Sequence, residues 1–340
     1  MASWQANQVV AVNADDRFDV VGFGALNVDL IYQTDSSTIT EIAGDAGVGT
    51  ETTAPPDELY SLLQHLERCG TLKSKDGGGQ AANTIVALSR MGFTCGYIGA
   101  VGEDEEGEFL LDSLESVDTT GIVQGGRSGI CVVMLEETGE RTMRVFPNVN
   151  NTISHAQVDT AYAARADLLH LTSFVGDGPL DAQRKLAKEL GDRCRIAFDP
   201  GDLYSRRALD ELREIIERAE IVLAADDEIE SMTGTDYERG CRELLSIGAR
   251  IVVAKKGKEG THVASGNNAF ATSAPPAEVV DKTGAGDVYA AGFIAGLLRG
   301  VSLEECAAFA SSIAAKSVTG YGRSQYPDKS DLAKLLDGGN

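Results

Sequence analysis

Four short stretches, DLLHLT (167–172), RIAFD (195–199), EIVLA (220–224) and RIVVA (250–254), recur along the second half of the 340-residue chain. Each is a brief apolar run, which predicts a buried strand. The segments between them are long enough for helices, for example over 179–190. Strands that alternate with helices predict an α/β fold, with a central, mainly parallel sheet and helices on both of its faces.

A segment of different texture interrupts this alternation. Ile130–Leu135 and Thr142–Phe146 are apolar runs that flank the sequence Glu-Glu-Thr-Gly-Glu. Two such runs around a glycine-bearing turn predict a β-hairpin. We expect the hairpin to belong to a small β-sheet lid whose strands come from about 27–42 and 120–148.

The remaining boundaries follow from composition. We expect a single α/β domain over 18–330, between an N-terminal extension (1–17) and a C-terminal tail (331–340). Residues 43–57 are rich in Gly, Thr and Pro and are expected to form a loop. The apolar stretch 284–319 is expected to form two helices.

The charge of the chain excludes several partners. Its 30 basic and 52 acidic residues give a formal net charge of −22. Such a surface repels nucleic acid and anionic membranes, so we expect neither as a partner. No apolar run reaches the roughly 18 residues that span a bilayer. High net charge keeps a protein soluble where salt screens its self-repulsion, which leads to the hypothesis of a halophilic protein in a salt-rich cytoplasm.

Two further features favour the cytoplasm. The six cysteines contain no C-x-x-C pair, and most stand in apolar runs, so we interpret them as reduced core residues. The N-terminus lacks a basic start followed by a long apolar block, so no secretory signal is expected.

The most informative segment is Asp281-Lys-Thr-Gly-Ala-Gly-Asp287, which precedes an apolar helical pattern. Backbone N–H groups at a helix N-terminus carry partial positive charge, and small residues there let a phosphate approach them closely. Asp287 has two interpretations. It caps the helix, or it accepts a proton from an attacking hydroxyl.

This segment resembles the C-terminal signature D-T-x-G-A-G-D of the ribokinase-like carbohydrate kinases, the PfkB family, with Lys282 in place of the usual Thr. The resemblance runs from about residue 18 to about residue 325. It implies a ribokinase-like fold, Asp287 as the catalytic base, and an anion hole formed by Gly284, Ala285 and Gly286.

The resemblance also implies the sugar-binding residues. Gly78-Gly79-Gln-Ala-Ala-Asn83 resembles the family's G-G-x-x-x-N segment, whose glycines and Asn hold sugar hydroxyls, and Asp29 matches its substrate-binding Asp. Gly139-Glu-Arg141 resembles the turn before a lid strand. Arg141 is therefore a candidate for substrate binding, and the alternative is a solvated hairpin residue.

Nucleotide-binding residues are implied in the same way. Lys256-Gly257-Lys-Glu-Gly260 resembles a nucleotide-proximal turn, although an ordinary hairpin turn is the alternative. Thr283 is expected near the nucleotide. Ser311 stands where family members often carry Asn near the adenine.

Metal handling shows one departure from the family. Glu228 keeps the acidic position of the N-x-x-E element that supports Mg²⁺ through water, but Ala225 replaces its Asn. Asp281 and Thr283 match positions beside a K⁺ ion that family members often bind. The expected cofactors are therefore ATP and Mg²⁺, with K⁺ as a further candidate.

The expected activity is ATP-dependent phosphorylation of a small sugar or sugar derivative, and we favour a pentose or a pentose phosphate such as ribose 1-phosphate. Basic residues in the lid region mildly support an anionic sugar. They are Arg127, Arg141, Arg144, Lys73 and Lys75. Nucleosides, 2-keto-3-deoxy acids, ADP as the donor and a non-catalytic sugar or nucleotide sensor remain alternatives. By resemblance alone, we expect a homodimer.

Three other classes of protein are disfavoured. A P-loop sequence is absent, and Gly22-Phe-Gly24-Ala-Leu-Asn27 lacks the third glycine of a dinucleotide-binding fingerprint. The four histidines are scattered without the spacing of zinc ligands.

Overall fold

The computed structural model describes residues 17–136 and 141–337. Most of the expected N-terminal extension, the Gly139-Glu140 turn and the last three residues of the expected tail lie outside the described residues. Within the described ranges, no helix is both long and apolar enough to cross a membrane.

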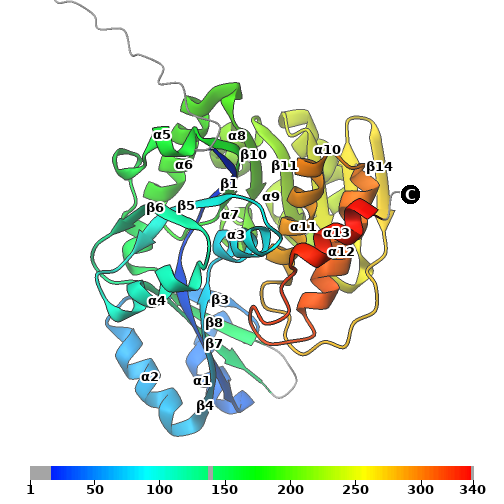
Figure 1. Cartoon of the computed structure of the whole chain (residues 1–340). Helices are drawn as coiled ribbons and strands as arrows, with labels where there is room; N and C mark the ends of the chain where they lie inside the picture. The colour runs from blue at the N-terminus through cyan, green and yellow to red at the C-terminus, as the bar shows by residue number, and fades with distance from the viewer. Residues whose placement is uncertain (1–16, 137–140, 338–340) are drawn as a thin grey trace, which may run out of the picture.

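The larger of two sheets forms the framework of the molecule (Figure 1). In the described residues its strand order is β14-β13-β12-β11-β10-β9-β1-β5-β6. Strands from β12 to β6 pair in parallel, and β13 and β14 add an antiparallel edge. The strands are β1 (Phe18–Phe23), β5 (Cys95–Val101), β6 (Asp118–Gln124), β9 (Ala166–Thr172), β10 (Arg195–Asp199), β11 (Ala219–Ala225), β12 (Ile251–Lys255), β13 (Thr261–Ser265) and β14 (Asn268–Thr272). The predicted mainly parallel sheet is confirmed.

Helices cover both faces of this sheet. Successive strand residues point to opposite faces, so Val20 and Val21 of β1 belong to two different buried clusters. One face packs against α3 (Gln80–Arg90), α4 (Glu105–Ser113), α11 (Ala285–Arg299), α12 (Leu303–Ser317) and α13 (Lys329–Asp337). The other packs against α5 (Thr160–Ala163), α6 (Asp177–Leu190), α7 (Gly201–Ser205), α8 (Leu209–Ile216), α9 (Asp226–Thr233) and α10 (Tyr237–Ile247). The two helices expected within 284–319 are α11 and α12.

The second sheet is the lid, which lies at the lower end of the molecule in Figure 1. Its order is β3-β8-β7-β2-β4. One face packs against α1 (Ser36–Ala43) and α2 (Glu58–Cys69), and the other carries the aliphatic cluster of Ile31, Val133 and Val145. The strands are β2 (Asn27–Thr34), β3 (Glu51–Thr53), β4 (Gly70–Gly78), β7 (Gly129–Leu135) and β8 (Arg141–Phe146).

The lid differs in detail from the sequence prediction. The expected strand over 27–42 ends at Thr34, because Asp35 caps a helix by accepting a hydrogen bond from the Thr38 N–H (2.9 Å). The expected loop over 43–57 contains β3. Within 120–148, β6 pairs with β5 of the main sheet rather than with the lid.

The expected C-terminal tail also differs from the prediction. Residues 329–337 form α13, whose Leu332 joins the main core. Five of the six cysteines are buried, Cys69 is partly buried, and all six are free thiols.

Candidate active site

Asp287 lies in the first turn of α11, at the end of the glycine-rich loop. Gly284 precedes the helix with φ 74°, a left-handed conformation that favours glycine. Gly284 therefore occupies the N-cap position, and the interpretation of Asp287 as the cap is wrong. Asp287 is buried, with 8% of the residue exposed.

Asn83 of α3 holds the Asp287 carboxylate. Its Nδ2 donates a hydrogen bond to Asp287 Oδ2 (2.8 Å), and the Thr84 hydroxyl donates to the Asp287 carbonyl oxygen (3.1 Å). Burial raises the pKa of Asp287 to about 7, while the Asn83 hydrogen bond and the charges of Lys255 and Arg141 lower it. Two segments that are distant in the sequence, each predicted to belong to the site, thus meet at the Asp287 carboxylate.

Asp29 stands on β2 beside the Gly78-Gly79 turn. A Cβ on Gly78 would lie 2.1 Å from Asp29 Oδ2, and Gly79 has φ 113° with its Cβ position 2.1 Å from the Ala25 carbonyl oxygen. Gly79 therefore requires glycine, and a side chain at Gly78 would displace the Asp29 carboxylate. Burial raises the pKa of Asp29 to about 7, and Arg323 is the main influence that lowers it. In the part of the chain that the structure describes, no residue donates a hydrogen bond to this carboxylate, so its oxygens can accept hydroxyl groups of a ligand.

Arg323 is a site residue that the sequence analysis missed. Its Nε donates to Asn83 Oδ1 (3.1 Å) and its Nη1 to the Ser113 carbonyl oxygen (2.8 Å). Because Oδ1 of Asn83 accepts from Arg323, the amide nitrogen must face Asp287. Among the described residues, the buried Nη2 of Arg323 has no partner. Arg323 stands alone in a Gly-rich segment between two helices, so no motif marks it.

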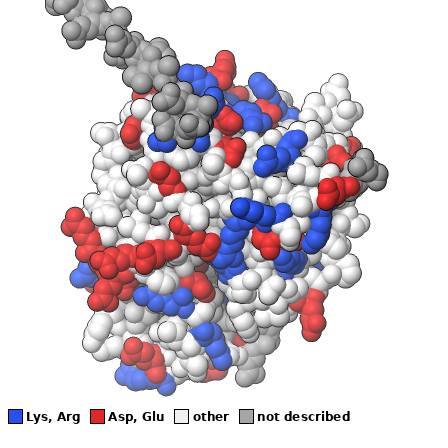
Figure 2. All heavy atoms as spheres, in the orientation of Figure 1, with Lys and Arg blue, Asp and Glu red and all other residues white. Residues whose placement is uncertain are grey.

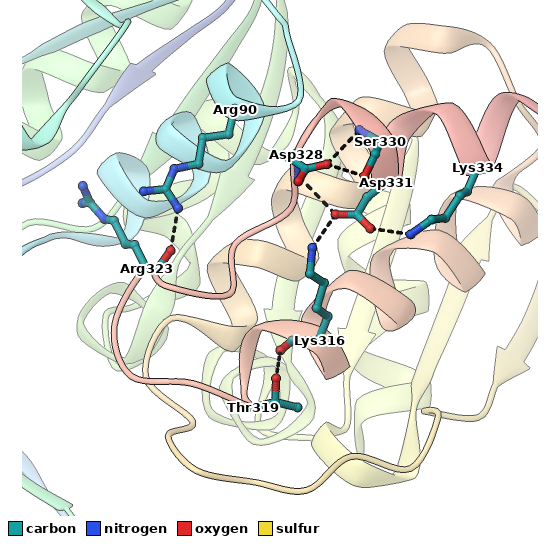
Figure 3. A network of polar contacts seen from close by, with 8 residues as sticks. All are labelled: Arg90, Lys316, Thr319, Arg323, Asp328, Ser330, Asp331 and Lys334. Carbon is teal, nitrogen blue, oxygen red and sulfur yellow. Dashed lines mark hydrogen bonds and ion pairs between the residues drawn. The ribbon is translucent and has the colours of Figure 1, made fainter.

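The backbone of Arg323 is fixed from a neighbouring helix. Arg90 of α3 donates from Nη1 to the Arg323 carbonyl oxygen (Figure 3). Beyond this point the chain enters α13, where Asp331 accepts from Lys316 Nζ of α12 (2.7 Å) and Lys334 Nζ (3.0 Å). These contacts hold the segment that carries Arg323 against the main domain.

Arg141 connects the lid to the glycine-rich loop. It begins β8, and its Nη1 donates to the Thr283 hydroxyl (3.2 Å). Its direction toward the loop contradicts the alternative of a solvated hairpin residue. A cavity of about 470 Å³ lies between the lid and this loop, lined by Ile31, Gln33, Lys73, Ser74, Val133, Leu135, Glu136, Val280, Asp281, Thr283 and Tyr321.

A buried ion pair on the main sheet was also missed. Lys255 ends β12 and donates to Asp199 Oδ2 at the end of β10 (2.6 Å). The two residues stand at the carboxyl ends of parallel strands, the edge where α/β sheets bind ligands. Glu228 lies nearby, and burial raises its pKa to about 7 against the influence of Lys255. Its Oε2 accepts from the Ala225 N–H (2.7 Å).

The residues expected to bind the nucleotide lie in separate elements of the fold. The Lys256 N–H donates to the Gly260 carbonyl oxygen (2.8 Å), and the Lys256 ammonium pairs with Glu259 (3.3 Å). These are the contacts of a tight hairpin turn. In that turn Gly257 begins a short 3₁₀ segment, and Gly260 has φ 96°. Ser311 is buried on α12, and within the described ranges its hydroxyl has no partner.

Asp281 joins two loops. Its Oδ1 accepts from the Thr283 N–H (2.9 Å) and its Oδ2 from the Gly322 N–H (3.3 Å). Each oxygen retains a lone pair, so the carboxylate can still contribute to a cation site. The role of Asp281 and Thr283 beside a K⁺ ion stays a prediction.

Residues 63–329 match the family described as pfkB family carbohydrate kinase. The chain belongs to this family. It is 37% identical over 243 residues to an uncharacterized sugar kinase of Archaeoglobus fulgidus, covering 70% of this chain and 96% of that protein. It is 30% identical over 266 residues to an ATP-dependent ribose-1-phosphate kinase of Halopiger xanaduensis, covering 77% and 87%.

Solved structures agree with this assignment. The adenosine kinase of Sinorhizobium meliloti superposes with a TM-score of 0.84 at 26% identity, covering 95% of this chain and all of that chain. The architecture, a large mainly parallel sheet with a small second sheet, is the ribokinase-like α/β fold. The predicted family and fold are both confirmed.

Proposed function

We propose that this kinase transfers the terminal phosphoryl group of ATP to a hydroxyl of a ribose-type sugar, with ribose 1-phosphate as the favoured substrate. The observation that carries this proposal is the buried Asp287 carboxylate in the first turn of α11, held by Asn83. A carboxylate with a pKa near 7 can take a proton from an alcohol at neutral pH.

Asp287 acts as the general base in this proposal. It accepts the hydroxyl proton while the sugar oxygen bonds to the γ-phosphorus and the bond from that phosphorus to ADP breaks. The N–H groups of Gly284 and Gly286 stabilise the charge on the moving phosphoryl group, because they lie at the N-terminal end of α11. The N–H of Ala285, the third residue of the expected anion hole, donates to the Lys282 carbonyl oxygen (3.2 Å) and shapes the loop instead.

In this proposal, the sugar contacts the protein on two sides. Asp29 accepts hydrogen bonds from two adjacent hydroxyls, and the missing side chains of Gly78 and Gly79 let the ring approach the backbone. Arg141 closes the lid over the substrate and thereby excludes water from the reaction.

The nucleotide extends from the glycine-rich loop toward the Lys256–Gly260 turn, with Thr283 beside its phosphates and Ser311 near its base. Mg²⁺ supplies charge neutralisation when bound. Within the described residues no cluster of three or more acidic, His or Cys side chains could hold a metal directly. This fits an ion held through water, which Glu228 would orient. Asp281 and Thr283 would contribute to a K⁺ site.

The preference for an anionic sugar rests on positive charge in an otherwise acidic protein. Arg141 and Arg323 lie at the sugar end of the site, and Lys73 lines the adjacent cavity. The 30% identical relative is named as a ribose-1-phosphate kinase. A nucleoside is the second candidate, because the lid face formed by Ile31 and Val133 is aliphatic and would accept a base.

A coupled ADP-release assay tests the proposal. Ribose 1-phosphate, ribose, nucleosides and 2-keto-3-deoxy acids are compared in high KCl with ATP as the donor, and AMP release is measured instead when ADP is the donor. We expect the highest kcat/KM with ribose 1-phosphate and ATP. A protein that binds nucleotide but consumes none with any of these sugars would instead support the non-catalytic sensor.

The Asp287→Asn variant tests the base. We expect kcat to fall on the order of 10³-fold with the fold intact, because the amide cannot accept the proton. Circular dichroism provides the control for folding. A folded and active Asp287→Asn enzyme would refute the assignment.

A further inference from the structure

The buried ion pair between Lys255 and Asp199 has no role in the proposal above. The side chain of Lys255 is 14% exposed and that of Asp199 is 2% exposed. Removing two charges from water costs more than their attraction commonly returns, and well-packed apolar residues often stabilise a fold as well. A pair buried at the ligand-binding edge of the sheet therefore calls for an explanation beyond stability.

The ammonium group of Lys255 lies against the glycine-rich loop. Its Nζ is 3.5 Å from the position that a Cβ on Gly286 would occupy. Its charge also lowers the pKa of Asp287. Lys255 is thus placed next to the backbone N–H groups at the start of α11.

Lys255 also retains hydrogen-bonding capacity. An ammonium has three donors, and in the described part of the chain one of them is used, by Asp199. The neighbouring strand places Ala225 in register with Lys255, and its methyl group offers no donor to a ligand. On this side of the glycine-rich loop, the Lys255 ammonium therefore supplies a positive charge and N–H groups that can bind a ligand.

We propose that Lys255 is a catalytic residue that binds the phosphoryl group in transfer, and that Asp199 is the positioning residue that aims it. The ammonium donates to a phosphoryl oxygen while the bond to the leaving ADP breaks and the bond to the sugar oxygen forms. Asp199 holds the side chain beside Gly286 through the 2.6 Å hydrogen bond. This role rests on the kinase activity and not on the identity of the sugar.

The test separates this role from a structural one. Lys255→Met alone would leave Asp199 buried and unpaired, so the Lys255→Met/Asp199→Asn double variant is made as well, because it removes both charges together. The control is Lys185→Met/Asp181→Asn, which makes the same substitutions in an ion pair of α6 (2.7 Å), on the opposite face of the sheet from α11.

Nucleotide binding is measured by calorimetry with a non-hydrolysable ATP analogue and with AMP, and turnover is measured by ADP release. For the double variant at Lys255 we expect about tenfold or greater loss of affinity for the ATP analogue, with AMP unchanged. We expect kcat to fall about 10²-fold or more. The control pair keeps both the affinities and kcat of the wild type.

A folded double variant with wild-type kcat would overturn the proposal. Equal losses of affinity for AMP and the ATP analogue would do the same, because a contact with the terminal phosphate cannot affect AMP. If no tested sugar is phosphorylated but binding of the analogue still depends on Lys255, the substrate assignment fails, the contact of Lys255 with the terminal phosphate stands, and its catalytic role is overturned for these substrates.

Discussion

The surroundings of Asp287 act on its pKa in opposite directions. The start of α11 and the Asn83 hydrogen bond favour its charged form, whereas burial favours the neutral form. Burial is the larger influence, and the pKa settles at about 7 rather than near its ordinary value of 3.8. The group is thus poised near the pH at which a general base works best.

The activity should therefore depend on pH through this group. The base must be deprotonated to accept a proton, so kcat at saturating substrate should be low below pH about 7 and reach a plateau above it. Asn83→Ala removes a hydrogen bond that favours the carboxylate, so the midpoint of the kcat profile should move to higher pH. Midpoints that coincide in the two enzymes would contradict this account.

Some residues of the candidate site could be predicted from the sequence, and others could not. Asp29, Asn83 and Asp287 stand in recognisable local patterns, and the structure brings Asn83 and Asp287 into contact. Lys255 and Arg323 carry no such pattern. Lys255 meets Asp199 only because two non-adjacent strands, separated in the sheet by β11, end at the same edge.

Among the elements, the strands of the main sheet could be predicted from the sequence, whereas the lid strands could be predicted less well. Buried parallel strands are continuous apolar runs, and their bounds in the structure lie within a residue or two of the quoted stretches. The lid strands β3 and β4 are short or exposed, so their sequences lack that signal. Most of helix α13 falls within the expected tail, because its nine residues bury only one apolar side chain, Leu332, and so carry little helical signal.

The docking of α13 depends on Asp331. This buried carboxylate accepts from Lys316, Lys334 and the Asp328 N–H (3.1 Å), as Figure 3 shows. We expect Asp331→Ala to cost about 1–3 kcal/mol in the free energy of unfolding, because the charge-assisted hydrogen bond from the partly exposed Lys316 ammonium and the bond from the Asp328 N–H are both lost. Hydrogen exchange should accelerate in α13 and remain unchanged in β9 and β10.

Lys334→Ala provides the comparison for this prediction. Its side chain is 75% exposed, so its pair with Asp331 should contribute little and its loss should be nearly neutral. Equal thermal stability of Asp331→Ala and the wild type would show that apolar packing alone holds α13.

For the whole molecule, net charge is the dominant property. Acidic side chains gather over the region of α4, whose first turn holds Glu105, Glu106 and Glu108 (Figure 2).

The predicted homodimer stays a prediction. The edge strand β4, which carries the 48% exposed Leu72, offers a surface on which a second lid could pair.

The charge predicts how stability responds to salt. With a net charge of −22, self-repulsion destabilises the compact state, and ions screen it. The melting temperature should rise as KCl increases from about 0.1 M to about 2 M, although the exposed ion pairs weaken over the same range. A melting temperature that falls from the lowest salt upward would contradict a salt-adapted protein.

Choline chloride at equal ionic strength separates screening from a specific K⁺ site. Screening depends on ionic strength, so the melting temperature should rise with either salt. A K⁺ ion beside Asp281 would act on the neighbouring glycine-rich loop, so kcat should be higher in KCl than in choline chloride. The Asp281→Asn variant should lose that difference while it keeps the salt dependence of its melting temperature. Equal kcat values of the wild type in the two salts would rule out K⁺ activation and leave the screening account intact.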